Sequence, residues 1–233
     1  MLYAKCAKHK YHYMHIILFM LGSRDYPKLI QDKLMQIYSA GVKHKQLDSD
    51  TIDVAEAIQC NRLSYYERTE PENDALPQII QRISKLGFQD AMGSKAAEYK
   101  VENLTLIVTP DLVFEKDFVV NIYPVSTIPD SLLPGDMLYT NACLFALDRE
   151  VGVVVYVTPD GQQTQYFVGK SNRMFEQVVR RARILSILLG ERKTPVIEPS
   201  QYCLNCKYND RCFPQQKDNS PQLLEGLFGL GKK

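Results

Sequence analysis

A chain of 233 residues with 45% hydrophobic and 24% charged residues has the composition of an ordinary globular protein. The formal net charge is only +1, so any nucleic-acid-binding surface must be local. The six cysteines show no regular pairing, which argues against a secreted disulfide scaffold and favours a cytoplasmic protein. An apolar run at 14–21 is too short to span a bilayer, so we expect neither export nor a membrane partner.

Hydrophobic periodicity predicts the elements in chain order. Helical spacing covers 26–38, 55–66, 76–86, 132–147 and 172–189, with Asp50 or Thr51 expected to cap the second helix. Strand patterns cover 99–108, 112–114, 118–125, 150–158 and 164–168, and the first three are expected to form a meander. The sequence therefore predicts an α/β (α+β) fold. We divide it into a helical extension at 1–45, a domain at 46–213 and a flexible tail at 214–233.

Three cysteines near the C-terminus follow the spacing C-x2-C-x5-C, at Cys203, Cys206 and Cys212. Zinc sites and iron–sulfur clusters normally take four protein ligands, and Cys60 on the predicted helix 55–66 is the candidate for the fourth. One distant cysteine with a close trio favours a [4Fe–4S] cluster over zinc, whose sites more often combine paired C-x2-C knuckles. Two alternatives stay open, namely four unrelated thiols and a redox-active C-x-x-C pair.

The order of these elements, with Cys60 at one end and the cysteine trio at the other, resembles the RecB-like CRISPR-associated exonucleases, the fourth protein of the Cas series. The resemblance covers about residues 50–213. It implies a PD-(D/E)XK nuclease-like core, in which helices flank a central mixed sheet, and a C-terminal region that carries the [4Fe–4S] cluster. A proline usually follows the first cysteine in that family, whereas this chain has Asn61.

The nuclease motif that the resemblance implies is incomplete. Such enzymes place an aspartate at the end of one strand and Glu-x-Lys on the next, so that carboxylates hold Mg²⁺ or Mn²⁺ while the lysine supports the attacking water. Asp111 matches the aspartate, but Asn121 and Tyr123 replace the glutamate and the lysine. A neutral amide binds these ions weakly, and a phenol is not a cation at neutral pH. We therefore predict a nuclease fold that no longer cuts, with Asp111 as a vestige.

Two other functions remain open. A different register, using Glu98 with Lys100 or Glu115 with Lys116, would restore carboxylate and lysine and make the chain an active metal-dependent 5′-to-3′ single-stranded DNA exonuclease. The chain could also be a protein-interaction module without DNA affinity. The favoured interpretation is a catalytically degenerate homologue that acts as a DNA-binding or scaffolding subunit in DNA processing.

Basic side chains that could follow a phosphate backbone gather on the predicted helix 172–189 and beside the cysteines. They are Arg62, Arg173, Arg180, Arg181, Arg183, Lys207 and Arg211. Because the implied family threads single-stranded DNA near this region, we predict single-stranded DNA and other DNA-processing or CRISPR proteins as partners. A solvated helix face is the alternative.

The C-terminal tail recovers an apolar pattern after a polar linker. Leu224, Leu227 and Phe228 resemble a degenerate sliding-clamp-binding box, with Pro221 where glutamine is usual. Such peptides insert apolar side chains into a pocket on the partner. Packing of the tail on its own domain is the alternative.

Overall fold

The computed structural model describes residues 28, 32–34, 36, 48–72, 74, 76–114 and 118–214. Most of the predicted helix 26–38 and all of the predicted clamp-binding segment therefore lie outside the described residues. The elements that follow residue 48 are β1 (Thr51–Asp53), α3 (Val54–Ile58), α4 (Asn61–Thr69), α5 (Leu76–Ala91), β2 (Ala97–Val101), β3 (Leu104–Val108), β4 (Leu112–Phe114), β5 (Phe118–Pro124), α6 (Pro134–Leu147), β6 (Val151–Val157), β7 (Gln163–Gly169), α7 (Asn172–Gly190), η1 (Gln201–Asn205) and α8 (Asn209–Cys212).

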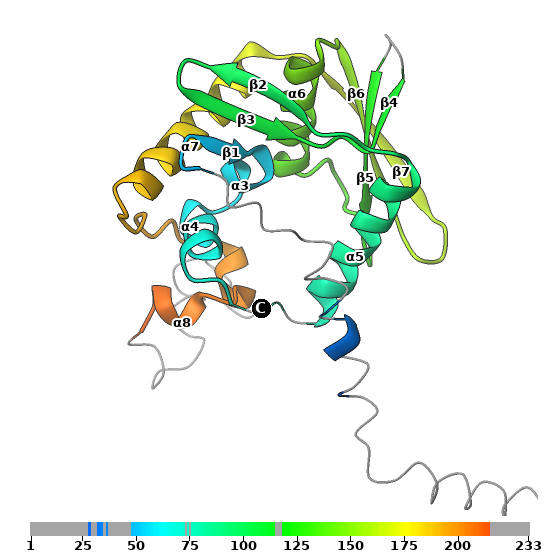
Figure 1. The fold of residues 1–233 in the computed structure, drawn as a ribbon. Helices are drawn as coiled ribbons and strands as arrows, with labels where there is room; N and C mark the ends of the chain where they lie inside the picture. Colours follow the sequence, from blue (N-terminus) through cyan, green and yellow to red (C-terminus); the bar gives the residue numbers. More distant parts are fainter. Residues whose placement is uncertain are drawn as a thin grey trace, which may run out of the picture.

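Two mixed sheets form the β part of the fold (Figure 1). One has the order β1-β3-β2, in which β1 runs parallel and β2 antiparallel to β3. The other has the order β4-β5-β6-β7, and its central pair β5 and β6 is parallel. Helix α6 connects these two parallel strands, as a crossover between parallel strands requires. The prediction of an α/β fold with mixed β-structure and flanking helices is confirmed, but the strands form two sheets rather than the single central sheet expected.

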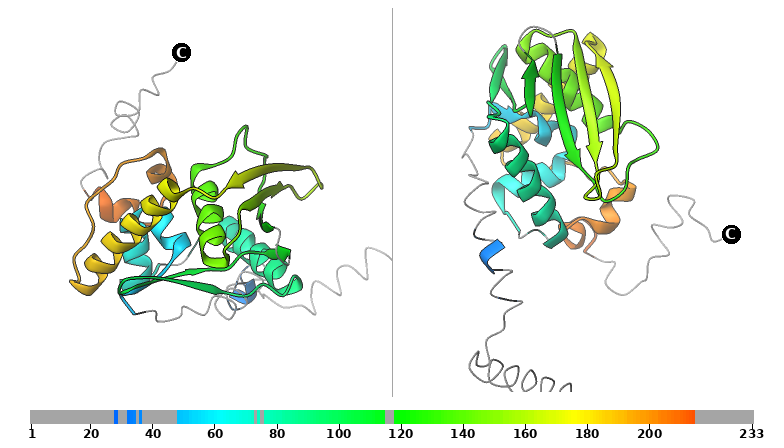
Figure 2. Two further views of the ribbon diagram at one scale, coloured as in Figure 1. Left: turned by 90° about the horizontal axis from the view of Figure 1, so that it is seen from above. Right: turned by 90° about the vertical axis from the view of Figure 1, so that its right-hand side faces the viewer.

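Helix α6 is the centre of the core. It contacts β5 and β6 of one sheet, β2 and β3 of the other, and helices α3 and α7. Seen from above in Figure 2, α6 lies between the β6–β7 hairpin and α7. Its sequence is apolar on nearly every side, which is typical of a helix surrounded by protein. Leu138, Ala142, Cys143 and Leu144 are all buried.

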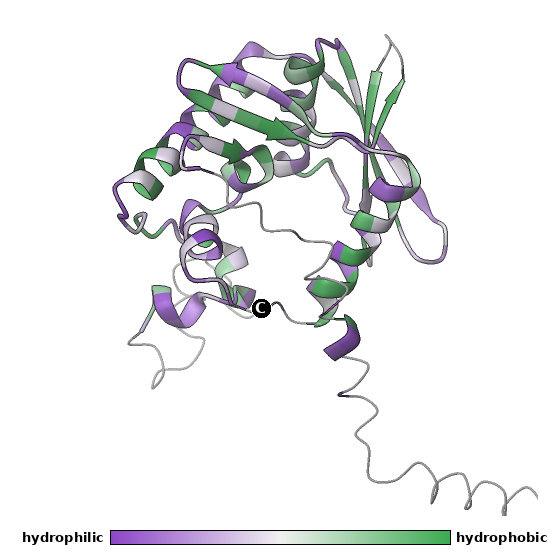
Figure 3. Ribbon diagram, in the orientation of Figure 1, coloured by the Kyte–Doolittle hydropathy of each residue, from purple (hydrophilic) through white to green (hydrophobic). Residues whose placement is uncertain are grey.

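The outer helices bury only one side. On α7, Phe175, Val178, Ala182 and Leu185 are buried, and this face packs on α3, α4 and α6. Figure 3 shows hydrophobic colour along β3 and β5, whereas α5 and α7 carry both hydrophobic and hydrophilic positions. Among the described residues, no helix combines the length and the hydropathy needed to cross a membrane.

Four local predictions are wrong. The expected strand 99–108 is the hairpin β2–β3, because Glu102 has a φ of 55° and turns the chain. β3 therefore belongs to one sheet and the β4–β5 hairpin to the other, so the expected three-strand meander is divided between them.

The expected helix 55–66 is also divided, because residues 59 and 60 are extended and separate α3 from α4. Its cap is Asp53 rather than Asp50 or Thr51. The Asp53 carboxylate accepts from the Ala55 N–H at 2.8 Å, while Glu56 accepts from the Asp53 N–H at 3.1 Å.

Candidate functional site

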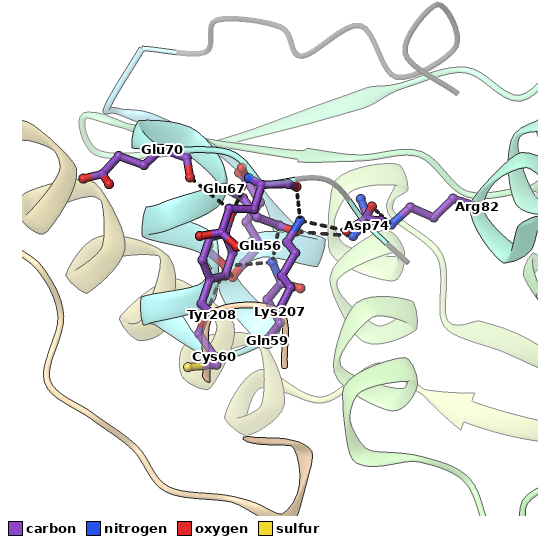
Figure 4. A network of polar contacts seen from close by, with 11 residues as sticks. Glu56, Gln59, Cys60, Glu67, Glu70, Asp74, Arg82, Lys207 and Tyr208 are labelled. Carbon is purple, nitrogen blue, oxygen red and sulfur yellow. Dashed lines mark hydrogen bonds and ion pairs between the residues drawn. The ribbon is translucent and has the colours of Figure 1, made fainter. Parts of the chain in front are cut away.

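The segment that carries the three C-terminal cysteines is held against α4 by ion pairs. Lys207 lies between Cys206 and Cys212, and its Nζ is 3.2 Å from Glu67 and 2.7 Å from Asp74. It also donates to the carbonyl oxygen of Glu72 at 3.0 Å. Figure 4 shows this network beside Cys60. These contacts bring together residues some 135 positions apart in sequence.

Tyr208 and Arg211 strengthen the same contact. Tyr208 is almost fully buried, its ring centroid lies 5.2 Å from that of Tyr66, and its hydroxyl accepts from the Glu72 N–H at 3.0 Å. Arg211 pairs with Glu70 at 2.5 Å and with Glu72 at 2.7 Å. The C-terminal segment therefore combines an aromatic anchor with charged contacts at its rim.

Cys60 lies at the junction of α3 and α4 rather than inside one helix. It occupies the N-cap position of α4, and its carbonyl oxygen accepts from the Ser64 N–H at 3.1 Å. Arg181 of α7 donates to the carbonyl oxygens of Ala57 at 2.8 Å and Gln59 at 2.7 Å, which fixes the junction. Because Cys60 stands where the chain turns, its side chain is not confined to the face of a helix.

All four predicted cysteine ligands have free thiols and influence one another electrostatically. Burial, and then the thiolates of Cys60 and Cys203, raise the pKa of Cys206. Burial and the other three cysteines also raise the pKa of Cys212, while the Arg62 guanidinium opposes them. Electrostatic effects of this kind fall off with distance, so each of these cysteines is near enough to the others to influence its ionisation. The four-cysteine ligand set itself stays a prediction.

Arg62 provides a positive group in this region that is only partly hydrogen-bonded. Its Nη2 donates to the Tyr66 hydroxyl at 3.2 Å, but its buried Nε has no hydrogen-bond partner among the described residues. A cluster held by four thiolates is anionic and has sulfur acceptors for such a donor. Within the described ranges, no three Cys, His, Asp or Glu side chains are close enough to hold a single metal ion. Four thiolates are a ligand set that either a [4Fe–4S] cluster or a structural zinc ion can take.

The second predicted site is centred on Asp111, between β3 and β4. Asp111 is 1% exposed, and its Oδ2 accepts from the Ile122 N–H at 2.5 Å. Asn121 on β5 is also buried, and its Nδ2 donates to Thr140 Oγ1 at 3.0 Å. The Asp111 N–H donates to the Val120 carbonyl oxygen at 3.1 Å, which places Asp111 beside β5, the strand that carries Asn121 and Tyr123.

Lys85 of α5 is the residue that the sequence analysis missed. Its Nζ forms an ion pair with Asp111 Oδ2 and donates to the Ile122 carbonyl oxygen at 2.6 Å. It also lies 4.7 Å from the centroid of the Tyr123 ring. Burial lowers the pKa of Lys85, whereas the Asp111 carboxylate acts in the opposite direction and favours the ammonium form. A magnesium or manganese ion does not fit this set of residues, because an ammonium already contacts the carboxylate.

Two further ionisable side chains lie near Lys85. Asp136, in the first turn of α6, accepts from the Tyr156 hydroxyl at 2.6 Å, and burial raises its pKa. Burial also raises the pKa of Tyr123 well above its ordinary value, so its phenol is neutral at physiological pH. Tyr123 therefore carries no positive charge at this centre.

The predicted DNA-binding side chains fall into two groups. Most have intramolecular partners: Arg62 bonds Tyr66, Arg181 bonds the α3–α4 junction, Arg183 pairs with Glu102 at 3.0 Å, and Lys207 and Arg211 pair with acidic residues of the α4 region. A phosphate would have to compete with these contacts. Arg173 and Arg180 lie two turns apart on one face of α7. Both are exposed and have no partner in the described part of the chain.

No protein-family model matches the chain, and no curated protein matches its sequence. Among solved structures, the crystal structure of SSO0001 has a TM-score of 0.60 at 18% sequence identity, covering 79% of this chain and 96% of that chain. The chain therefore shares the fold of SSO0001. LHK-Exo, an alkaline exonuclease from Laribacter hongkongensis, gives a TM-score of 0.41 at 10% identity, covering 68% of this chain and 93% of that chain. Its complex with dAMP gives 0.40 at 8% identity. The last two TM-scores are too low to establish a common fold.

Proposed function

We propose that this protein is an iron–sulfur, catalytically degenerate homologue of the RecB-like CRISPR-associated exonucleases that binds single-stranded DNA or acts as a scaffold in DNA processing. The observation that carries the proposal is the occupation of Asp111 by Lys85 in a centre where Asn121 and Tyr123 replace the other two motif residues. Asp111 stands before β4 and Asn121 on the neighbouring β5, as the nuclease motif requires, but the chemistry that the motif needs is missing.

The cluster is proposed as a structural element held by Cys60, Cys203, Cys206 and Cys212. Bound there, a [4Fe–4S] group supplies four iron–thiolate bonds that link the beginning of the domain to its end. The free energy of such binding contributes directly to folding, because the unfolded chain has no preformed site. The contacts of Lys207 and Tyr208 with the α4 region hold the C-terminal cysteine segment near the helix that follows Cys60. This reduces the entropy that is lost when the cluster assembles.

DNA affinity is assigned to the exposed face of α7, because the phosphate backbone is bound chiefly by charge. Arg173 and Arg180 leave their guanidinium groups available on this face. The same proposal includes two kinds of protein partner, and both rest on the sequence alone. One is a protein of a CRISPR or repair complex, and the other is a sliding clamp bound through Leu224, Leu227 and Phe228.

Full-length protein purified without oxygen tests the proposal in three measurements. We expect the broad visible absorbance of an iron–sulfur protein, with iron and sulfide in equal amounts. We expect labelled single-stranded DNA to remain intact with Mg²⁺ or Mn²⁺, both for the wild type and for Asp111→Ala. Degradation by the wild type that disappears in Asp111→Ala would establish the active exonuclease instead.

DNA binding is measured as a function of salt. Replacing Arg173 and Arg180 with glutamine removes two phosphate contacts, so the salt-dependence slope for single-stranded DNA should fall by about 1.4. Lys100→Gln, on the exposed side of β2, is the matched control and should leave the slope unchanged. Absence of any DNA binding by the wild type would favour the protein-interaction module.

A further inference from the structure

We infer that Lys85 is a permanent substitute for a divalent cation, so that the Asp111 centre is closed to Mg²⁺ and Mn²⁺ but contains a latent metal site beneath the lysine. This inference rests on the proposed function and deepens it. It gives the proposed lack of nuclease activity a second cause, besides the replacement of the motif residues at 121 and 123.

The position of the Lys85 nitrogen supports this assignment. It contacts one carboxylate oxygen, from Asp111, and one backbone carbonyl oxygen, from Ile122. Hard divalent cations take carboxylate and carbonyl oxygens of this kind. The ammonium therefore contacts oxygen atoms that could otherwise bind a divalent cation. It also neutralises a carboxylate that would otherwise be buried without a counter-charge.

The surroundings of Lys85 hold it in place. Its side chain is 24% exposed, and its stem arises from the rigid helix α5, which packs on β5. The Tyr123 ring lies against the ammonium, where the face of an aromatic ring attracts a cation. A lysine that served an attacking water would need its nitrogen free to face substrate, whereas this one is committed to protein groups on three sides.

Two buried side-chain oxygens of this centre remain unused. The buried Oδ1 atoms of Asp111 and Asn121 have no hydrogen-bond partner among the described residues. The Asp136 carboxylate is near enough to favour the charged form of Lys85. Without the lysine, the Asp111 carboxylate and the Ile122 carbonyl oxygen would face the vacated position. Magnesium and manganese bind such sets with water completing the coordination.

The experiment measures Mn²⁺ binding by the loss of the room-temperature electron paramagnetic resonance signal of free Mn²⁺, using the full chain with its cofactor content unchanged. Wild type and Asp111→Asn should bind Mn²⁺ equally, because the wild-type centre is closed. Lys85→Ala should bind one additional ion at least about tenfold more tightly than wild type, which corresponds to about 1.4 kcal/mol. Adding Asp111→Asn to Lys85→Ala should abolish the gain, and Lys100→Ala should produce none.

Two results would overturn the inference. One is Mn²⁺ binding by the wild type that is lost in Asp111→Asn, and the other is a folded Lys85→Ala variant without the additional ion. The comparison of wild type with Asp111→Asn remains decisive if Lys85→Ala does not fold. Neither result depends on visible absorbance or DNA affinity, so failure here is distinguishable from failure of the proposed function.

Discussion

The cysteine region and the Asp111 centre are both assembled from distant parts of the chain, yet they differ in how their charges are balanced. At the cysteine region, Arg62 keeps a buried Nε without a partner in the described structure, and the four cysteines are free thiols. At the Asp111 centre, Lys85 already neutralises the carboxylate. The proposed anionic cluster at the first region and the proposed closed centre at the second both rest on this difference.

Loss of a cluster ligand should break the cysteine region and produce the largest effect. Cys206→Ser replaces a soft thiolate with a hydroxyl that binds iron poorly, so we expect loss of the visible absorbance. We also expect a large fall in the melting temperature, because the cluster's binding free energy contributes to folding. Absorbance spectra and thermal unfolding under nitrogen measure both.

Cys143→Ala is the control for this variant. Cys143 is buried against Asn121, away from the proposed ligands, so its replacement should keep the absorbance even though it leaves a small cavity. Equal absorbance in wild type and Cys206→Ser would contradict the four-cysteine ligand set.

Removal of Lys85 should leave the buried Asp111 carboxylate without a counter-charge. Lys85→Met keeps the length of the stem but leaves a buried carboxylate unpaired, which typically costs about 3–5 kcal/mol. The double variant Lys85→Met with Asp111→Asn removes both charges and should recover most of this loss. Denaturant unfolding of the four proteins in the cycle measures the coupling, and additive losses would show that the pair contributes little.

The sequence predicted most of the helices and strands that carry the two regions, but not the ion pair of Lys85 that distinguishes them. Helices α5, α6 and α7 and strands β5 to β7 followed from hydrophobic periodicity, because each buries one face or is buried on all sides. The spacing of Asp111 and Asn121 placed them on neighbouring strands. Lys85 escaped detection because a lysine on an amphipathic helix is normally solvated, and nothing local to 76–91 indicates that α5 directs it at a carboxylate 26 positions away.

The break at Cys60 was missed for a related reason. Its flanking residues have helical periodicity, and the division depends on Arg181, which bonds the carbonyl oxygens at the junction from 122 and 124 positions away. Local patterns predict elements well, whereas contacts between side chains and distant backbone decide where an element is interrupted.

A smaller effect tests the packing that supports the Asp111 centre. A Cβ added at Gly152 of β6 would lie 2.3 Å from Thr140 Cγ2, and Thr140 accepts the hydrogen bond of Asn121. Gly152→Ala should therefore destabilise the protein by about 1–3 kcal/mol, the usual cost of overpacking. Gly169→Ala, on the adjacent strand β7 with no atom within 4 Å of the added Cβ, is the matched control. Equal unfolding midpoints for the two variants would refute the close approach of α6 to β6.

The smallest expected effect is the reactivity of single thiols, which sharpens the contrast between the regions. Burial raises the pKa of Cys143 to about 12, so at pH 8 about one molecule in ten thousand carries the reactive thiolate there. In folded protein stripped of iron, iodoacetamide should label the partly exposed Cys60, Cys203, Cys206 and Cys212 and leave Cys143 unmodified. Raising the pH to 9 increases the Cys143 thiolate about tenfold, but the thiol remains enclosed by α6 and β5, so labelling should stay negligible until the protein unfolds. Peptide mass spectrometry measures each site, and labelling of Cys143 before the other four would show that the Asp111 centre is the more open region.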